Sequence, residues 1–545
     1  MQEENKYVFI VKENSIRKLI HTLSRYEIVA RCIHVAIHLG LHKIIDDNQS
    51  ISISDIHRDL ISQQKIENLD INPLTRLLKF LSCYGIFKVY GNTVQHTVLS
   101  QALNGESVIK SIFGLNEEEW KKQGDLLNYL SNVENSKKVL ISYSQVDITL
   151  DINNISLIFS AETSESLLTE LANLNLLSRA IYTVAELNLA DLIYDGINTI
   201  SLLVEKTNQN QTALTTLIAI LLRFKILTER TGHLYLTEAG QALMEGENSI
   251  SIKAAARMAN IPWWNAIGKL GYCIETGKSP YVAANGISVF EYLEANKNQR
   301  IKFDKGLANS DADQDSVVAN VDGVFEGYHS IVDIGGGNGG LITHLVERYP
   351  TIKAILFEQP GTIEHLQNNL LSDTNSPLNK CQLQSGNFLD SFKKNGIPRH
   401  KDLYIIKGVL HDFTDEEVVI ILKNIRHAMS NHSKLKIIER YVDDDNKPHL
   451  NKIGDMQMMA FFGSKERSFN DYKRLANEAC LLLDENNIRS CGNYNIIIAT
   501  PNPMLGKFFT PHHKPYFDKE TIEKLKGMTS EERIELLPFL INHIM

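Results

Sequence analysis

An internal repeat occupies the first half of the 545-residue chain and constrains its fold more than any other sequence feature. Leu39 in HVAIHLGLHKII aligns with Leu187 in YTVAELNLADLI, at an offset of 187 − 39 = 148 residues. Ile86 in RLLKFLSCYGIF aligns with Ile226 in TLIAILLRFKIL, at an offset of 226 − 86 = 140 residues. A third pair of blocks, LSQALNGE and TEAGQALMEGE, keeps the second offset. Several matches in one order at nearly one offset indicate that a structural module is present twice.

Both copies combine the same predicted elements: an apolar helix ending in Leu-x-Leu, a polar helix-turn-helix, a longer apolar helix and a short hairpin. Three helices followed by a hairpin are typical of a winged helix, which can place a helix in the major groove of DNA. Copy one (residues 16–106) has 10 basic and 8 acidic residues, and copy two (residues 167–247) has 5 and 9. Because neither copy carries a basic footprint, we expect dimerisation or scaffolding and no nucleic-acid partner.

The overall composition is that of a globular protein, with 43% apolar residues, 22% charged residues and a formal net charge of −9. The six cysteines are scattered and form no C-x-x-C pair, so we expect reduced core thiols and no metal site. The first residues, MQEENKYVFIVKENS, do not resemble a signal peptide, and no apolar run approaches the ~18 residues of a membrane span. We therefore expect a cytoplasmic protein with no membrane partner.

From about residue 330 the pattern changes to short β-rich runs that alternate with amphipathic helices. The predicted strands are SIVDIG (330–335), KAILFE (353–358), CQLQSG (381–386), LYIIKGV (403–409), KLKIIERYV (434–442) and YNIIIAT (494–500). The segment NDYKRLANEACLLL is among the predicted helices. This alternation predicts a mostly parallel sheet with helices on both faces, where ligands bind beyond the carboxyl ends of the strands.

A glycine-rich loop, VDIGGGNGG, includes the end of the first predicted strand. Gly335, Gly337 and Gly340 satisfy G-x-G-x-x-G, a motif common to dinucleotide sites and to other nucleoside-bearing cofactors. Glu358 ends the next strand, where a carboxylate can accept both hydroxyls of a ribose. Asp333 would repel a pyrophosphate but suits a cationic ligand. It therefore favours S-adenosylmethionine, which carries a sulfonium and an ammonium but no phosphate.

At this point a family resemblance becomes visible. Residues from about 255 to 500 resemble the small-molecule O-methyltransferases of the caffeate and hydroxyindole type and their bacterial relatives. The blocks that carry the resemblance are PWWNAIGKLGYCIETGKSPY (262–281), VDIGGGNGG (332–340), FEQPGTIE (357–364), GNFLDSF (386–392), LYIIKGVLHDFTDEEVVIILKNI (403–425), IIER (437–440) and GDMQMMAFFGSKERS (454–468). The repeated module is similar to the N-terminal dimerisation domain of that family, which typical members carry once.

The resemblance implies a catalytic base and two acids. His411 occupies the base position in VLHDF, where it would remove the proton of an acceptor hydroxyl whose pKa is near ~10. Glu439 and Glu466 occupy the positions of acids that orient the imidazole. The alternatives are a strand-end surface acid for Glu439 and a salt bridge to Arg467 for Glu466.

The resemblance also implies which residues contact the cofactor and the acceptor. The expected cofactor-binding residues are Asp333, Gly335, Gly337, Glu358, Asn387, Phe388 and Lys407. Asn387 departs from the usual aspartate but can still accept through its side-chain oxygen, and Lys407 could instead pair with a surface acid. The expected acceptor pocket is aromatic and sulfur-rich, for a flat aromatic molecule, with core packing as the alternative for each member: Trp263, Trp264, Met458, Met459 and Phe462.

We therefore expect a multidomain chain: two mostly α winged-helix-like dimerisation modules and an α/β Rossmann-like class I methyltransferase domain. The expected segments are a first, degenerate module (1–150), a second module with a helical linker (156–310), the methyltransferase domain (311–500) and a C-terminal helical tail (501–545). The two modules would form an intramolecular pseudo-dimer or part of a homodimer. The expected activity is O-methylation of a small aromatic molecule, as in secondary metabolism. N- or C-methylation, another use of the cofactor, and a non-catalytic regulator remain alternatives.

Overall fold

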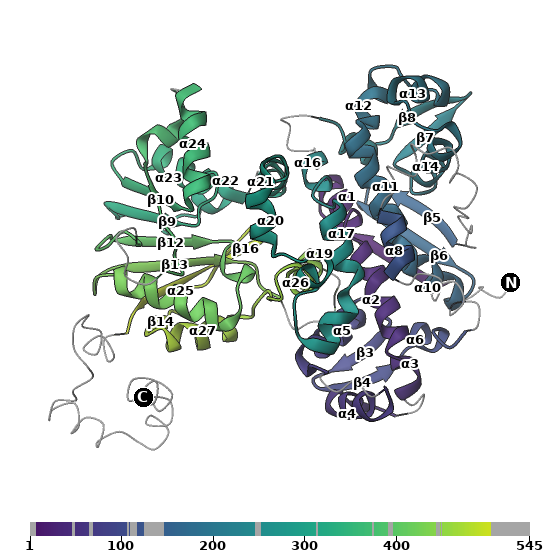
Figure 1. Ribbon diagram of the computed structural model, residues 1–545, viewed down its shortest axis with the longest axis horizontal. Coiled ribbons are helices and arrows are strands. Elements are labelled where there is room, and N and C mark those ends of the chain that lie inside the picture. The colour runs from purple at the N-terminus through teal and green to yellow at the C-terminus, as the bar shows by residue number, and fades with distance from the viewer. Residues whose placement is uncertain are drawn as a thin grey trace. The chain divides into compact units, whose positions relative to one another are not determined.

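The computed structural model divides into two compact units (Figure 1): residues 1–313 with 442–466, and residues 314–441 with 467–545. The residues that it describes are 7–45, 49–64, 69–105, 108, 117–124, 146–245, 252–311, 314–372, 375–390, 396–442, 447 and 449–502. Among these residues, no helix is both long and apolar enough to span a membrane. The expected C-terminal tail lies outside the described residues from residue 503 onward.

The first unit repeats one succession of helices and hairpins. Copy one contains α2 (Glu27–His38), α3 (Leu41–Ile44), α4 (Ile53–Gln64), α5 (Ile71–Cys83), β3 (Phe87–Tyr90), β4 (Thr93–His96) and α6 (Val98–Ala102). Copy two contains α11 (Leu174–Leu187), α12 (Leu189–Tyr194), α13 (Ile200–Thr207), α14 (Gln211–Arg223), β7 (Leu227–Arg230), β8 (His233–Leu236) and α15 (Glu238–Gln241). Copy one adds a two-residue strand, β2 (Ile51–Ser52), which pairs with β4.

The two hairpins are closed by the same hydrogen bonds. The Thr97 hydroxyl donates to the carbonyl oxygens of Gly85 and Ile86, at 2.7 and 2.8 Å. At an offset of 237 − 97 = 140, the Thr237 hydroxyl donates to Lys225 and Ile226, at 2.7 and 3.0 Å. Each threonine also caps the helix after its hairpin, so one side chain fixes two elements.

The turn of the second hairpin precedes His233. Thr231 and Gly232 form this turn with φ angles of 50° and 81°, whereas His233 is the first residue of β8. Two positive φ angles in succession match the twist of a tight hairpin.

Two tryptophans join the segments that follow the copies. Trp120 of α8 (Glu117–Gly124) and Trp264 of α17 (Ile261–Gly268) stack with ring centroids 4.7 Å apart and planes 19° apart. Each indole Nε1 donates to the other residue's carbonyl oxygen, at 2.9 and 2.7 Å. A Cβ at Gly124 would lie 2.3 Å from the ring of Trp264, and one at Gly268 would lie 2.4 Å from the ring of Trp120. Glycine is therefore required where each ring crosses the other helix.

An arginine from each copy lies over one of these rings. The Arg31 guanidinium carbon is 5.4 Å from the centre of the Trp120 ring, and that of Arg179 is 5.5 Å from the Trp264 ring. The two arginines are 179 − 31 = 148 residues apart, the offset found in the aligned sequence blocks. The repeat therefore extends to the contacts of individual buried side chains.

A small antiparallel sheet also joins the two halves of this unit. Strand β1 (Tyr7–Lys12) pairs with β6 (Ser156–Ala161), and β6 pairs with β5 (Val146–Asp151). Phe9 lies opposite Phe159 in the register, with ring centroids 5.9 Å apart. Strands β1 and β6 precede α1 (Ile16–Leu23) and α10 (Ser164–Ala172), so a strand and a helix come before α2 and before α11 alike.

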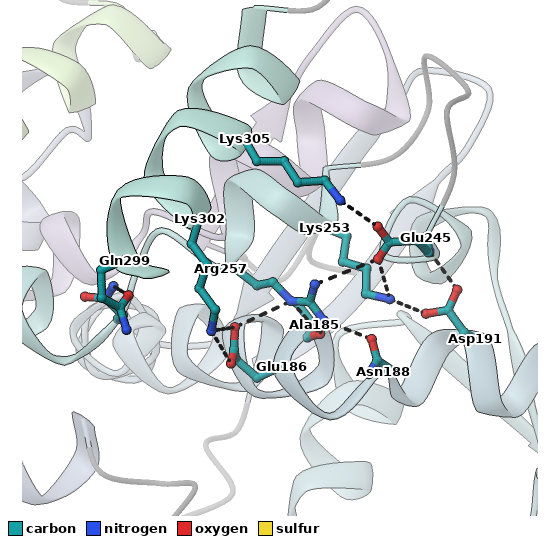
Figure 2. A network of polar contacts seen from close by, with 11 residues as sticks. Ala185, Glu186, Asn188, Asp191, Glu245, Lys253, Arg257, Gln299, Lys302 and Lys305 are labelled. Carbon is teal, nitrogen blue, oxygen red and sulfur yellow. Dashed lines mark hydrogen bonds and ion pairs between the residues drawn. The ribbon is translucent and has the colours of Figure 1, made fainter. Parts of the chain in front are cut away.

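A polar network ties copy two to the helices that follow it (Figure 2). Glu245 pairs with Lys253 of α16 (Lys253–Ala256) at 3.0 Å and with Lys305 of α21 (Lys297–Asp311) at 3.1 Å. Glu186 of α11 pairs with Lys302 of α21 at 3.1 Å. Three other helices follow α17 before α21: α18 (Leu270–Thr276), α19 (Pro280–Asn285) and α20 (Val289–Ala295).

Arg257 closes the end of α11 in the same network (Figure 2). Its guanidinium donates to the carbonyl oxygen of Ala185, at 3.0 and 2.7 Å, and to the side-chain oxygen of Asn188 at 2.9 Å. Asn188 ends α11 with φ of 56°, and Gly40 has φ of 65° after α2 in copy one, at an offset of 148. Both copies therefore turn through a left-handed residue, which asparagine and glycine tolerate.

The second unit contains one large sheet, in the order β11-β10-β9-β12-β13-β16-β14. Its strands are β9 (Ser330–Ile334), β10 (Lys353–Glu358), β11 (Gln382–Ser385), β12 (Leu403–Lys407), β13 (Lys434–Glu439), β14 (Leu481–Leu483), β15 (Arg489–Cys491) and β16 (Tyr494–Pro501). The strands from β11 to β13 are parallel, and β16 is antiparallel to its neighbours. The expected Rossmann-like sheet is thus present, with an antiparallel edge.

Helices cover both faces of this sheet, as the alternating pattern predicts (Figure 1). One face packs against α22 (Gln314–Ala319), α23 (Gly340–Arg348) and α24 (Pro360–Ser372). The other packs against α25 (Asp415–Ala428) and α27 (Phe469–Glu478). The short helices η2 (Pro377–Lys380) and η3 (Leu410–Asp412) complete the described helices of this unit.

Two sequence expectations about the second half need correction. The predicted helix NDYKRLANEACLLL is interrupted: α27 ends at Glu478, Cys480 has φ of 58°, and Leu481–Leu483 form β14. The apolar LLL run fits either element, and its pairing with β16 decides for the strand. In addition, residues 442–466 with α26 (Leu450–Phe461) belong to the first unit, although we expected them in the methyltransferase domain.

Candidate active site

The glycine loop lies between β9 and α23. Gly335, Gly337 and Gly339 have φ of 66°, 55° and 79°, in the left-handed region that favours glycine. The N–H of Gly335 donates to the carbonyl oxygen of Phe357 in the next strand, at 2.8 Å. A Cβ at Gly335 would lie 2.9 Å from Val409, whereas one at Gly337 would meet no atom within 4 Å. The loop therefore combines a tight turn with an open position.

Asp333 lies buried beneath this loop, 1% exposed. Neither of its carboxylate oxygens has a hydrogen-bond partner among the described residues. Burial raises the pKa of Asp333 to about 7, with help from the charges of Asp315 and Glu358 and against the charge of Lys407. A buried carboxylate without a partner is costly, and a cation or hydrogen-bond donor on a ligand would offset that cost.

Lys407 ends β12 and approaches Asp315, an acid that the sequence analysis did not single out. Its ammonium lies 3.1 Å from Asp315 Oδ1 and 4.6 Å from the centre of the Tyr494 ring. The ion pair is the alternative that we gave for Lys407, although the partner is an acid at the start of α22. The only signal for Asp315 in the sequence was an acid at a helix start, which is too common to be informative.

The other expected cofactor residues follow β10 and β11. Glu358 ends β10, and its carboxylate accepts the backbone N–H of Gln359. Asn387 is exposed, and its side-chain oxygen accepts the N–H of Leu389 at 2.9 Å. Phe388 is 9% exposed and meets Phe413 edge to face, with ring centroids 5.5 Å apart. These residues follow neighbouring strands at the carboxyl edge of the sheet, where open α/β sheets bind ligands.

His411 and Glu439 form a close pair at the same edge. His411 Nδ1 lies 2.8 Å from Glu439 Oε2, and the glutamate side chain is fully buried. The other carboxylate oxygen accepts the N–H groups of Val409 and Leu410, at 3.0 and 2.7 Å. Burial alone would raise the pKa of Glu439, but the charge of His411 and these hydrogen bonds hold the pKa below its usual value. Glu439 is therefore a buried carboxylate and not a surface acid.

The rest of the His411 surroundings hold the ring in place. His411 Nε2 lies 3.4 Å from Asp412 Oδ1, and burial raises the pKa of Asp412 to about 6. Arg467 donates to the carbonyl oxygens of Leu410 and Phe413, at 2.6 and 2.7 Å. We missed Arg467 as a support of this loop, having assigned it only as a possible partner of Glu466.

The remaining expected site residues belong to the first unit. Glu466 is 6% exposed, and its backbone N–H donates to Asp455 Oδ1 at 2.9 Å. Met458 and Phe462 are half-buried on and after α26, whereas Met459 is buried in the apolar core. Trp263 is also buried and packs edge to face on Tyr281, Tyr292 and Phe461, with a tilted contact to Phe303. Trp264 packs against Trp120, as described above.

An O-methyltransferase domain matches residues 268–481. The O-methyltransferase SfmM3 of Streptomyces lavendulae is 30% identical over 296 residues, which cover 52% of this chain and 84% of that protein. The chain belongs to the O-methyltransferase family. Mitomycin biosynthesis 6-O-methyltransferase of the same organism is 28% identical to the present chain, over 56% of this chain and 86% of that protein.

Solved structures of O-methyltransferases have the same fold. The mitomycin 7-O-methyltransferase MmcR has a TM-score of 0.54 at 26% identity and covers 59% of this chain and 93% of its own. Human N-acetylserotonin methyltransferase, in complex with S-adenosylmethionine, has a TM-score of 0.54 at 21% identity, over 62% and 96% of the chains. The present chain is an S-adenosylmethionine-dependent O-methyltransferase with a class I Rossmann-like domain and an N-terminal helical region. The unpartnered carboxylate of Asp333 fits that cationic cofactor.

Proposed function

We propose that this enzyme transfers the methyl group to a hydroxyl of a small aromatic molecule, with His411 as the general base. The contact between His411 Nδ1 and buried Glu439, at 2.8 Å, carries the proposal. A carboxylate on Nδ1 favours the tautomer with its proton there, which leaves Nε2 as the basic nitrogen. The same carboxylate stabilises the imidazolium that forms when His411 takes up a proton.

For the cofactor, we assign binding to residues at the carboxyl edge of the sheet. When bound, S-adenosylmethionine supplies an electrophilic methyl group on a positively charged sulfur. Asp333 would face the positive charge of the cofactor, and Glu358 would face its ribose hydroxyls. The backbone of Gly335 and Gly337 would let the cofactor approach closely. Lys407 would contact the cofactor from the end of β12, and Asn387 and Phe388 would lie at its adenine.

On the acceptor side, we assign orientation to aromatic and thioether groups. Half-buried Met458 and Phe462 would contact a flat acceptor, with Trp263, Trp264 and Met459 as the buried support behind them. The names of several relatives specify aromatic substrates, such as phenazine and 3-amino-4-hydroxybenzoate. Glu466, from the SKERS segment, would serve as the second acid that orients the base.

In the reaction, His411 Nε2 would accept the proton of the acceptor hydroxyl, so that the oxygen could take up the methyl group that bound S-adenosylmethionine would supply. Glu439 stays ionised, because its buried carboxylate is held by His411 and by two backbone N–H groups. A positioned base contributes ~10²–10⁴-fold to such a reaction.

Replacement of the base tests this proposal. The enzyme and its His411→Ala variant would be incubated with S-adenosylmethionine and hydroxylated benzoates, naphthoates and phenazines, and the release of S-adenosylhomocysteine would be followed. We expect His411→Ala to lower kcat by ~10²–10⁴-fold, with cofactor affinity unchanged by calorimetry. The exposed His432→Ala serves as the matched control. A His411→Ala enzyme with normal kcat would refute the role of the base.

We also propose that the two copies form an intramolecular pseudo-dimer of the family's dimerisation domain. The reciprocal Trp120–Trp264 hydrogen bonds and the antiparallel pairing of β1 with β6 support this proposal. It predicts a particle of 61.6 kDa in light scattering. A mass near twice that value would instead favour a homodimer.

A further inference from the structure

Arg76 of copy one reaches the helix that carries the proposed acceptor residues. Arg76 lies on α5, and its guanidinium grips Asp455 of α26 with Nε to Oδ2 at 3.0 Å and Nη2 to Oδ1 at 2.8 Å. The same guanidinium donates to the carbonyl oxygen of Asp455 at 2.7 Å and to that of Ser464 at 3.0 Å. Four donor contacts from one planar group fix both the start and the end of the segment 455–464.

Asp455 connects Arg76 to Glu466 through one shared carboxylate oxygen. The Oδ1 atom that accepts from Arg76 also accepts the backbone N–H of Glu466, at 2.9 Å. A Cβ at Gly454 would lie 3.6 Å from Glu466 Oε1, so the glutamate side chain folds back toward α26. The backbone position of the proposed second acid therefore depends on a carboxylate that Arg76 holds.

The contact is partly shielded from water. The side chains of Arg76 and Asp455 are 20% and 13% exposed, and α26 itself contributes buried apolar residues to the core of the first unit. A bidentate arginine–carboxylate pair in such a place is worth more than a surface pair, because water competes less for its hydrogen bonds. Lysine could not replace it, since an ammonium cannot contact both carboxylate oxygens and two carbonyls in one plane.

Copy two lacks this arginine. At an offset of 216 − 76 = 140, the matching residue is Thr216, a half-buried threonine of α14 whose hydroxyl donates to the carbonyl oxygen of Thr212 at 3.1 Å. Copy one also supplies Arg25, which donates to Gln457 of α26 at 2.8 Å. Copy one has therefore specialised in holding α26 and is more than a degenerate scaffold.

We infer that Arg76 is a positioning residue for methyl transfer, which acts through Asp455 on the backbone of Glu466. This inference rests on the proposed function, since it explains what holds Glu466, the proposed second acid, in position. A relative with one N-terminal module has no second copy that could keep the original residue while the first copy changes. In this chain the two copies occupy different places, so one of them can carry a contact to the acceptor side that the other does not.

Kinetics of four variants test the inference with the full-length enzyme and the best acceptor of the panel above. We expect Arg76→Ala, Arg76→Lys and Asp455→Asn each to lower kcat by ~10–100-fold, while the dissociation constant of S-adenosylmethionine stays unchanged. Thr216→Ala, the matched substitution in copy two, should have normal kcat. The amide of Glu466 should exchange faster with deuterium in Arg76→Lys, which is a readout that needs no acceptor.

A double-mutant cycle separates positioning from a general loss of stability. If Arg76 acts through Glu466, Arg76→Lys should cause little further loss of kcat in a Glu466→Gln background. A full, additive loss would overturn the inference. Normal kcat in Glu466→Gln would refute the role of Glu466 and the inference with it. Slow Glu466→Gln with normal Arg76→Lys and Arg76→Ala would overturn the inference alone.

Discussion

Copy one and copy two close their hairpins with equivalent threonines, and each places an arginine over the tryptophan that follows it. They differ in α5 and α14, where Arg76 of copy one contacts Asp455 but Thr216 of copy two donates only to Thr212 of its own helix among the contacts of the described residues. The shared positions keep two modules folded and paired. The position that diverged contacts a segment outside the repeat, so a comparison of the two copies separates residues that maintain the fold from one with a specialised role.

The largest effect should come from the tryptophan pair, where the copies are most alike. We expect Trp120→Ala and Trp264→Ala each to lower the free energy of unfolding by about 3–5 kcal/mol, because each removes a buried ring and leaves a carbonyl oxygen without its donor. The measurement is chemical denaturation followed by intrinsic fluorescence and circular dichroism.

Similar losses in the two variants would support the symmetry of the interface. The two copies would not be equivalent if one variant lost less than about 1 kcal/mol of unfolding free energy while the other lost about 3–5 kcal/mol. Gly124→Ala and Gly268→Ala should destabilise in parallel, because a Cβ at either position meets the opposing ring.

A smaller effect is expected in the cofactor affinity of the second unit. This affinity should not depend on Arg76, the position at which the two copies differ. Because the pKa of Asp333 is about 7 and a cationic ligand favours its ionised form, affinity for S-adenosylmethionine should rise from pH 5.5 to 7. The limit is about tenfold per pH unit, or ~1.4 kcal/mol, and the affinity should level off above the pKa. Calorimetry at several pH values measures this profile.

Two variants sharpen this result. Asp333→Asn should bind the cofactor more weakly and with little dependence on pH over this range, whereas Arg76→Ala should show the profile of the unmodified enzyme. A flat profile in the unmodified enzyme would exclude Asp333 as the group that faces the positive charge.

The smallest effect is expected at the hairpin threonines. Thr97→Val and Thr237→Val should each cost about 1 kcal/mol of unfolding free energy, because each loses a helix cap and hydrogen bonds to two carbonyl oxygens. Thr149→Val, at an exposed strand position, is the control. A loss confined to one copy would show that the hairpins contribute unequally despite their matching geometry.

Much of this architecture was visible in the sequence because it rests on local patterns. The strand KAILFE was predicted with the bounds that β10 has, because it is a short apolar run within a regular alternation of strands and helices. The place of the glycine loop and of Glu358 followed from the order of strands, because parallel strands end at one edge of the sheet. His411 was singled out by the family resemblance.

What the sequence did not reveal are contacts between distant segments. Arg76 and Asp455 are 379 residues apart, and neither has a neighbour in the sequence that indicates its partner. Asp315 appeared as an ordinary acid at a helix start, and its pairing with Lys407 emerged only from the fold. The LLL run was ambiguous for a different reason, since a short apolar run suits a helix and a strand alike.

The pairing of β1 with β6 occurs within one chain. Its extent therefore does not depend on how much protein is present, whereas two separate subunits come apart when they are diluted below their dissociation constant. An enzyme built in this way keeps both modules together at concentrations where a weak homodimer would be half dissociated. It can also accept a substitution on one side only, which a symmetric dimer, where every change occurs twice, cannot do.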